Sequence, residues 1–198
     1  LRKRKKEKRY LMLMMSDTRG GKAKPIDGTP EKPFGFYCCG PTVYGPAHIG
    51  NFRTFVAQDV FRRVAELSGV VMTHVRNITD VDDKTIRVSQ EEGKILYDFT
   101  TYWTKQFHVD CAALNLLEPH VEPAAVAHIP EQIALIKRLM EKGHAYVGED
   151  GSVYFNIASF ESYGGLSKVK ERELATPSSE AQLSDEYGKN TLADFALW

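Results

Sequence analysis

The segment Phe36 to Asn51, FYCCGPTVYGPAHIGN, limits the possible folds most strongly. It begins as an apolar strand, passes through a turn that contains glycine and proline, and continues as a helix that opens near His48. A helix that follows such a turn directs free backbone N–H groups and the positive end of its dipole toward the turn. This pattern is typical of a phosphate-binding strand–turn–helix, but an ordinary connection with a buried cysteine has the same pattern.

The next elements predict the start of a parallel sheet. A helix is expected over residues 48–68, followed by Gly69 and by a Val- and Ile-rich strand over residues 70–78. Together with the strand at 34–39 this makes a right-handed βαβ unit. The helix repeats apolar residues every four positions (Phe52, Val56, Val60 and Val64, with Phe55 and Leu67 beside them), and we expect this stripe to lie on the sheet. Charged residues, including Asp59 and Arg62, occupy its other faces.

Further elements follow from periodicity and turn chemistry. A short strand near residues 11–15 is followed by an expected loop up to Pro33. Asp82 and Asp83 are expected to cap a helix that starts near Lys84, whereas Asp80 receives no role. A helix over residues 95–114 carries a stripe of Ile95, Phe99, Trp103, Phe107 and Cys111, which indicates a core face with an inert thiol.

The remaining chain predicts a loop at 119–123, a helix at 129–142, and a hairpin of residues 144–147 and 152–156 with Asp-Gly as its turn signal. Residues 167–190 are polar and indicate a flexible linker. His108 and His120 have no partner at ligand spacing, which favours surface or packing roles.

The composition restricts the class of protein. The 198 residues are 42% hydrophobic and carry no net charge, although the first ten hold seven Lys or Arg against one Glu. We interpret this basic run as a solvated tail, with contact to nucleic acid or an anionic membrane as the alternative. No stretch reaches the apolar length of a membrane span, and the apolar run after the basic block is too short for a signal peptide. Three cysteines do not indicate a disulfide framework, and a cytoplasmic location is expected.

Several motifs, in order, resemble one known family. CGPTVY followed by HIGN is similar to the first signature of class I aminoacyl-tRNA synthetases, and most similar to cysteinyl-tRNA synthetases. HIGN stands where that family usually has HIGH. The resemblance continues through NITDVDDK, ALNLLEPHVEP, YGGLS and DFALW, and covers most of residues 33–198.

The resemblance implies an α/β fold with a Rossmann-like parallel sheet and a connective α+β insertion. Residues 1–33 would form a basic tail and leader segment, residues 34–115 the first half of the nucleotide-binding catalytic domain, residues 116–166 the connective insertion, and residues 167–198 a flexible segment that begins the return to the catalytic domain. It also implies that a KMSKS-like loop, an anticodon domain and the remaining zinc ligands lie after Trp198. The chain would then be the N-terminal part of a larger enzyme and inactive alone.

The resemblance further implies ATP-dependent activation of L-cysteine and transfer of the cysteinyl group to tRNA(Cys) by a monomer, with Mg²⁺ accompanying ATP and with no membrane partner. The residues that match family positions are His48 and Asn51 as catalytic residues; Tyr44, His48, Gly50 and Asn51 for ATP; Gly40, Thr42 and Thr79 for cysteine; and Cys39 as a Zn²⁺ ligand. Asn51 replaces the usual second histidine and cannot become cationic. Thr42 and Thr79 also fit simple turn chemistry.

Two other functions remain open. One is a cysteine ligase of thiol biosynthesis that joins cysteine to an amino-sugar, although that family has TPY where this chain has TVY. The other is a non-catalytic module that binds nucleotide or tRNA. A second cysteine, further zinc ligands and a KMSKS-like loop in a longer sequence would favour the synthetase.

Overall fold

The computed structural model describes residues 12–166 and 194–198. These fall into two compact units, one within Leu1–Met15 and Ala23–His128, the other within Ser16–Lys22 and Ile129–Trp198. Each unit is described by itself below. The predicted linker at 167–190 lies outside the described residues.

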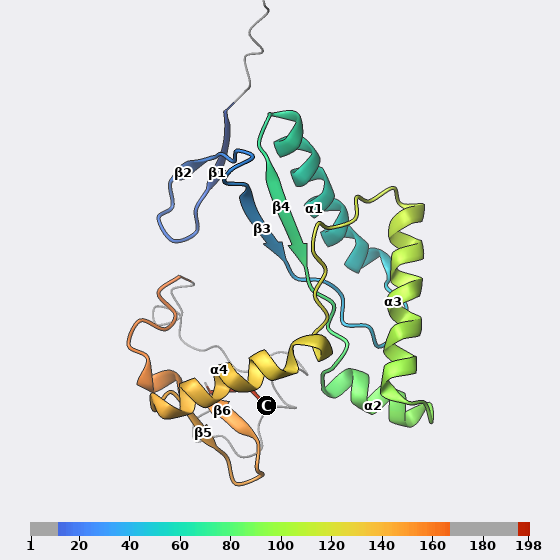
Figure 1. The fold of residues 1–198 in the computed structure, drawn as a ribbon, viewed down its shortest axis with the longest axis vertical. Helices are drawn as coiled ribbons and strands as arrows, with labels where there is room; N and C mark the ends of the chain where they lie inside the picture. The colour runs from blue at the N-terminus through green and yellow to red at the C-terminus, as the bar shows by residue number, and fades with distance from the viewer. Residues whose placement is uncertain (1–11, 167–193) are drawn as a thin grey trace, which may run out of the picture. The chain divides into compact units, whose positions relative to one another are not determined.

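The first unit is built on a parallel sheet, which confirms the predicted α/β class (Figure 1). Strand β3 (Phe34–Cys38) pairs in parallel with β4 (Met72–Arg76), in a register that runs from Phe34 opposite Met72 to Cys38 opposite Arg76. The short strands β1 (Leu13–Ser16) and β2 (Ala23–Ile26) form a separate two-stranded sheet, so the loop expected up to Pro33 contains a strand that the sequence did not predict.

A third segment runs beside β4, where the sequence predicted a loop. Parallel bridges join Val75 to Val121 and Ile78 to Ala124, and the N–H group of Ile78 donates to the carbonyl of Pro123 over 2.8 Å. Pro123 has no N–H group to donate, so the segment pairs at isolated positions and not as a continuous ladder. The short 3-10 helix η1 (Val126–His128) follows it.

Helix α1 (Ile49–Leu67) connects β3 to β4 as predicted, and Gly69 follows it with a φ of 90°. The expected packing face is confirmed at Phe52 and Phe55 and is wrong at the three valines and Leu67, which are exposed. The buried positions are Phe52, Phe55, Asp59, Arg62 and Ala65. The side chains of Val56, Val60 and Val64 are 39%, 53% and 43% exposed.

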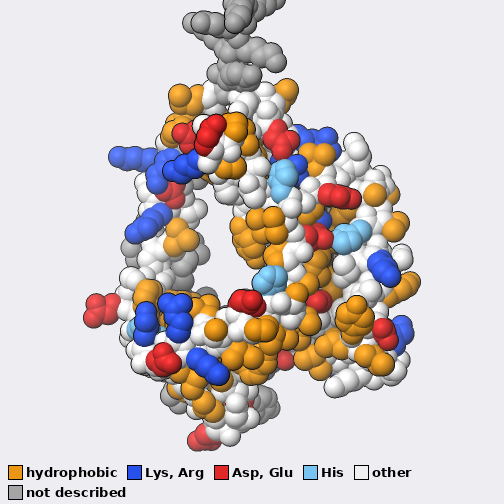
Figure 2. All heavy atoms as spheres, viewed as in Figure 1, with side chains coloured by type: hydrophobic (Ala, Val, Ile, Leu, Met, Phe, Trp, Pro, Cys, Tyr) orange, Lys and Arg blue, Asp and Glu red, His pale blue; other side chains and the backbone are white. Residues whose placement is uncertain are grey.

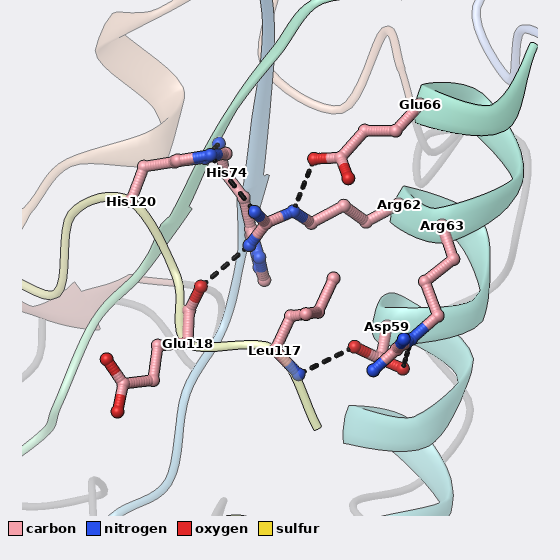
Figure 3. A network of polar contacts seen from close by, with 8 residues as sticks. All are labelled: Asp59, Arg62, Arg63, Glu66, His74, Leu117, Glu118 and His120. Carbon is pink, nitrogen blue, oxygen red and sulfur yellow. Dashed lines mark hydrogen bonds and ion pairs between the residues drawn. The ribbon is translucent and has the colours of Figure 1, made fainter. Parts of the chain in front are cut away.

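Two charged residues are buried on α1 because residues 117–118, which follow helix α3 (Leu96–Ala113), supply partners for them (Figure 3). The N–H group of Leu117 donates to Asp59 Oδ1 over 2.8 Å, and Arg62 donates to the carbonyl oxygen of Glu118 over 2.7 Å. Arg62 also bonds to the carboxylate of Glu66 over 2.7 Å. Burial of a charge is tolerated when such bonds replace water, and these bonds hold residues 117–118 against α1.

Two further helices complete the first unit. Helix α2 (Asp83–Glu91) begins after Asp82, whose carboxylate accepts from the N–H group of Thr85 over 2.7 Å. The predicted cap is therefore confirmed for Asp82, whereas Asp83 is the first residue of the helix. Helix α3 (Leu96–Ala113) presents most of the predicted stripe to the core. That core contains Val43, Phe52, Phe55, Ile78, Phe107 and Cys111, with Trp103 packed against it. Ile95 is the exception and is 71% exposed.

The second unit contains helix α4 (Ile129–Glu141) and an antiparallel sheet of β5 (Ala145–Val147), β6 (Val153–Phe155) and β7 (Phe195–Ala196). The predicted hairpin is confirmed by the pairing of β5 with β6. The short 3-10 helix η2 (Ile157–Ser159) follows β6. Asp194 is 3% exposed and accepts hydrogen bonds from the hydroxyl of Tyr146 and the N–H group of Ile157, over 2.9 and 3.0 Å.

The described helices contain none that is long and apolar enough to cross a lipid bilayer. Figure 2 shows acidic and basic side chains interspersed with hydrophobic ones on the face in view.

Candidate active site

The turn after β3 begins with a close approach between two backbone segments. The N–H group of Gly40 donates to Asn77 Oδ1 over 3.0 Å, and the hydroxyl of Tyr37 donates to the same oxygen over 3.0 Å. A Cβ atom on residue 40 would lie 1.6 Å from the carbonyl oxygen of Asn77. Only glycine therefore fits at position 40, because any other residue would collide with the chain that leaves β4.

The two predicted threonines lie opposite each other where these segments meet. Thr42 and Thr79 form a parallel bridge, in which the N–H group of Val43 donates to the carbonyl of Thr79 over 3.1 Å. The hydroxyl of Thr79 accepts from the side-chain amide of Asn77 over 3.1 Å. Thr79 thus contributes to the turn, as its alternative interpretation predicted, whereas Thr42 also lines a pocket described below.

His48 is the N-cap residue of α1. Its Nδ1 atom accepts a hydrogen bond from the N–H group of Gly50 over 3.0 Å. In the neutral ring this leaves the proton on Nε2, a tautomer assigned here from the hydrogen-bond geometry. Within the described part of the chain Nε2 has no partner, and the side chain is exposed. His48 is therefore oriented by its own helix and keeps one donor available.

Asn51 completes the capping box. Its side-chain oxygen accepts from the N–H group of His48 over 3.0 Å, and its own N–H group donates to the carbonyl of His48 over 2.9 Å. The N–H group of Phe52 also donates to that carbonyl, over 3.1 Å. Most of the first N–H groups of the helix are therefore used within the cap. A ligand here would therefore be bound mainly by the Nε2–H group of His48 and the side-chain amide of Asn51, and less by free backbone N–H groups of the helix.

A pocket of about 320 Å³ lies over this turn. It is lined by Cys39, Gly40, Pro41, Thr42, Val43, Tyr44, Gly45, Pro46, Ala47, His48, Asn51, Thr54, Phe55, Trp103 and Phe107. Six of the eight predicted site residues are in this lining. The other two, Gly50 and Thr79, act on lining residues through hydrogen bonds.

The aromatic wall of the pocket was not predicted as part of a site. Trp103 and Phe107 come from α3, and Phe55 comes from α1. The sequence signal for these residues, an apolar repeat at helical spacing, is the same for a core face and for a pocket wall. Phe55, Trp103 and Phe107 belong to the core or pack against it and also line the pocket.

A buried arginine supports this wall from behind. Arg76, at the end of β4, is 3% exposed, and its guanidinium carbon lies 4.9 Å from the ring centre of Phe107 and 5.7 Å from that of Phe55. It forms an ion pair of 2.7 Å with Glu122, whose other oxygen lies 2.6 Å from His108 Nε2. The charge of Arg76 is thus neutralised on the side away from the candidate active site.

The two adjacent cysteines differ as strand alternation predicted. Cys39 is exposed and lines the pocket, whereas Cys38 is half-buried and is not in the lining. Burial and the neighbouring thiol of Cys39 raise the pKa of Cys38 to about 11, so Cys38 is a poor thiolate. Cys111 is buried, and burial raises its pKa as well.

The described residues do not form a zinc site. Among them there is no group of three or more His, Cys, Asp or Glu side chains that could hold a metal ion. Zinc usually takes four ligands in a structural site and three protein ligands in a catalytic site. Cys39 offers one accessible thiol, which alone does not meet this requirement.

Comparison with known proteins gives a consistent assignment. A model described as tRNA synthetases class I (C) catalytic domain matches residues 26–198. A "Cysteine--tRNA ligase" of Opitutus terrae is 56% identical over 174 residues, which are 85% of this chain and 38% of that protein. Proteins of the same name from Chlamydia caviae and Koribacter versatilis are each 42% identical, over 98% and 95% of this chain and 39% and 38% of theirs.

The chain thus spans about two fifths of the length of these relatives. A crystal structure from Campylobacter jejuni, described as that of an arginyl tRNA synthetase, has a TM-score of 0.47 and 12% identity, covering 82% of this chain and 47% of that one. The family model covers the candidate active site and most of both units. The chain therefore belongs to the class I (C) tRNA synthetase catalytic-domain family, the cysteinyl-tRNA synthetase family that its motifs resemble.

Proposed function

We propose that this chain, as part of a longer protein, activates L-cysteine with ATP and transfers the cysteinyl group to tRNA(Cys). The observation that carries the proposal is the pocket in which the exposed thiol of Cys39, the cap residue His48 and the side chain of Asn51 lie together. It occurs at the carboxyl end of a parallel strand, where open α/β sheets bind ligands.

In the proposed first step a carboxylate oxygen of cysteine attacks the α-phosphorus of ATP, and the bond from that phosphorus to the bridging oxygen of pyrophosphate breaks. The products are cysteinyl adenylate and pyrophosphate. Mg²⁺ would accompany the ATP. In the second step a terminal ribose hydroxyl of the tRNA attacks the carbonyl carbon of the adenylate, loses its proton, and releases AMP. Both steps depend on positioning and on stabilisation of developing negative charge.

His48 has the clearest role in this scheme. The bond from Gly50 to Nδ1 fixes the ring, and Nε2–H is free to donate to a phosphate oxygen of ATP. Such a donor stabilises the transition state more than the ground state when charge builds on the oxygen that it contacts. Asn51 would add an amide donor, and Tyr44 and Thr42 would border the bound substrates.

Discrimination between cysteine and serine favours a metal. Thiolate binds zinc well and an alcohol binds it far less well, whereas shape separates near-isosteres poorly. We propose Cys39 as the zinc-binding thiol, with the other ligands outside the described residues.

The test uses the full-length protein. Cysteine-dependent exchange of pyrophosphate into ATP is measured first, with serine as the control amino acid, and transfer is then compared between tRNA(Cys) and an amino-sugar acceptor. We expect His48→Ala to lower exchange by about a hundredfold or more, the usual scale for loss of one fixed donor at a developing charge. Asn51→Ala should cost less, because an amide, unlike an imidazole, cannot become cationic as negative charge develops.

His128→Ala is a matched control, because His128 is also exposed but lies in η1, outside the pocket lining, where its ring Nδ1 lies 2.9 Å from the carbonyl oxygen of Ala124. Exchange in this variant should stay within about twofold of wild type. A wild-type protein that shows no cysteine-dependent exchange, or one that uses the amino-sugar and not tRNA, contradicts the proposed function.

A further inference from the structure

The candidate active site has no permanent positive charge in its lining. Among its fifteen residues there is neither lysine nor arginine, and His48 in the assigned tautomer is a neutral donor. Arg76 lies behind the aromatic wall, where Glu122 neutralises it. Phosphate groups in protein sites are usually met by at least one cation. A ligand that brings phosphate into this pocket therefore needs a cation from beyond the lining.

Lys84 is placed to supply it. Lys84 is the second residue of α2, and its Nζ atom lies 5.6 Å from the ring centre of Tyr44. Tyr44 lines the pocket and is 43% exposed. This separation is shorter than the screening length of about 8 Å at physiological salt. A phosphate that reaches the Tyr44 side of the pocket would come within range of the ammonium group.

Two of the nearby carboxylates, those of Asp82 and Asp80, accept backbone hydrogen bonds. Asp82 accepts from the N–H group of Thr85 over 2.7 Å, and Asp80 accepts from the N–H group of Val126 over 2.9 Å. In the part of the chain that the structure describes, Lys84 forms no ion pair with a carboxylate. Among residues 12–166 and 194–198 its ammonium group lies over the ring of Tyr44, and no described carboxylate neutralises its charge.

Lys94 provides a contrast within the same unit. Its Nζ atom also lies over an aromatic ring, 5.8 Å from the centre of Phe99. However, it forms an ion pair of 2.7 Å with Glu92, and Phe99 is outside the pocket lining. The two lysines share the cation–π contact and differ in free charge and in proximity to the pocket.

We propose that Lys84 is a phosphate-contacting residue of the candidate active site. This inference rests on the proposed function, since it requires a phosphate-bearing ligand in the pocket. Two such ligands fit the same chemistry, the phosphates of ATP and the backbone phosphates at the acceptor end of an RNA. The assay arms below separate these sources.

The experiment compares Lys84→Ala, Lys84→Arg and Lys94→Ala in the full-length protein. The first arm measures cysteine-dependent pyrophosphate exchange without tRNA, with ATP varied. The second arm starts from preformed adenylate and measures transfer with tRNA varied. We expect Lys84→Ala to raise the KM by about tenfold for the ligand whose phosphate Lys84 contacts, and Lys84→Arg to stay within about threefold of wild type. Lys94→Ala should match wild type in both arms.

Salt separates a charge contact from a packing role. Raising the salt concentration should weaken binding of the phosphate ligand more steeply in the wild type than in Lys84→Ala, since the variant has lost one charge contact. Thermal unfolding of Lys84→Ala should stay near that of the wild type, because exposed side chains rarely contribute much stability.

The outcomes that overturn the inference are distinct from those that overturn the function. If Lys84→Ala equals Lys94→Ala in both arms while the wild type is active, Lys84 contacts no phosphate and the proposed function stands. If the wild type shows no exchange and no transfer, the proposed function fails. Lys84 is then still tested by calorimetric titration of ATP and of tRNA, in which equal dissociation constants for wild type and Lys84→Ala overturn the inference.

Discussion

The imidazole of His48 and the backbone of Gly50 are fitted to each other. The N–H group of Gly50 donates to Nδ1 over 3.0 Å, and a Cβ atom on residue 50 would lie 2.8 Å from Cε1 of the same ring. Carbon atoms that are not bonded prefer separations of about 3.5–4.0 Å. A side chain at position 50 would therefore push the ring out of its place. The glycine of HIGN is thus needed by the histidine that precedes it.

Gly50→Ala should consequently impair chemistry more than folding. We expect cysteine-dependent pyrophosphate exchange in the full-length protein to fall by about tenfold to a hundredfold, because the donor on His48 is misplaced but still present. The unfolding temperature should change little, since position 50 is exposed in the first turn of α1. Gly35→Ala is the control, because a Cβ atom there meets nothing within 4 Å. Wild-type exchange in Gly50→Ala would contradict this role for the glycine.

The sequence predicted the ends of α1 well and the face that it buries poorly. Capping chemistry at His48 and Gly69 set the ends, and both are local features. Which face is buried depends on residues 115–120, which are distant in sequence and supply partners to Asp59 and Arg62. A periodicity argument treats those two charges as exposed, because it contains no information about a distant segment whose backbone will supply their buried hydrogen-bond partners.

Gly40→Ala should affect folding directly. A Cβ atom at position 40 would overlap the carbonyl oxygen of Asn77, at 1.6 Å, and neither group is at the end of a flexible side chain. We expect a loss of about 2–4 kcal/mol in the free energy of unfolding, in the range of the more severe single substitutions. Urea unfolding of the full-length protein measures it, with Gly35→Ala again as the control. Equal midpoints for the two alanine variants would show that the close approach is absent.

Removal of one partner of the Arg76–Glu122 ion pair should lower the free energy of unfolding substantially. The Arg76 side chain is 4% exposed and that of Glu122 is 19% exposed. Glu122→Ala leaves the guanidinium buried without its partner, which typically costs about 3–5 kcal/mol. The exposed pair of Arg87 and Glu91, with side chains 62% and 57% exposed, is the reference, and Glu91→Ala should cost less than about 0.5 kcal/mol.

Chemical unfolding of both variants gives the comparison. A second readout is activity, because Arg76 supports the rings of Phe107 and Phe55 in the pocket wall. Similar losses of stability in Glu122→Ala and Glu91→Ala would show that Arg76 is solvated in solution.

The site itself could be predicted only in part. The turn residues from Cys39 to Asn51 were found because they are contiguous in sequence and carry family motifs. The supporting residues were not found, because Arg76 and Glu122 are brought together by the pairing of residues 121–124 with β4. Two prolines in and beside that segment favoured a loop, and its few bridges left no period to detect.

His74 should make stability depend on pH. It is 2% exposed, and neither ring nitrogen has a partner among the described residues. Burial, followed by the charges of Arg62 and Arg76, lowers its pKa from 6.5 to about 4, with His120 acting in the same direction and Asp59 opposing it. The folded state thus binds the proton more weakly than the unfolded state. Above pH 6.5 the ring is neutral in both states, and the free energy of unfolding is not reduced by its titration. As the pH falls from 6.5 toward 4, the unfolded state takes up the proton first, and the free energy of unfolding decreases by about 1.4 kcal/mol per pH unit.

His74→Phe keeps a ring against Phe36, whose centre lies 5.1 Å from that of His74, and removes the titration. Between pH 6.5 and 5 the unfolding free energy of the variant should decrease by about 2 kcal/mol less than that of the wild type. At pH 7 its stability should stay within about 1.5 kcal/mol of wild type, since no hydrogen bond of the ring is lost. His128→Gln, at an exposed site, is the control. Parallel pH profiles for wild type and His74→Phe would mean that His74 is solvated.

The last prediction concerns the metal. Cys39 is exposed in the pocket lining, whereas Cys38 is outside it with a pKa raised to about 11, and Cys111 is buried in the core. Zinc binds an accessible thiolate, so burial and a raised pKa disfavour Cys111 and Cys38 as ligands. In the full-length protein Cys39→Ser should therefore lose most of the bound zinc and cysteine activation with it. Cys38→Ser and Cys111→Ala should keep the metal, and alanine is chosen for Cys111 so that no hydroxyl is buried in the core.

Elemental analysis of the three purified variants gives the zinc content per chain, and exchange assays with cysteine and serine give the activity. The zinc content is the decisive quantity, because Cys39 also borders the turn and a loss of activity alone would not identify a ligand. Its carbonyl accepts from the side-chain amide of Gln58 over 3.3 Å, a bond that serine at position 39 leaves intact. If Cys39→Ser retains one zinc per chain while Cys38→Ser or Cys111→Ala loses it, the thiol that binds the metal has been assigned to the wrong residue.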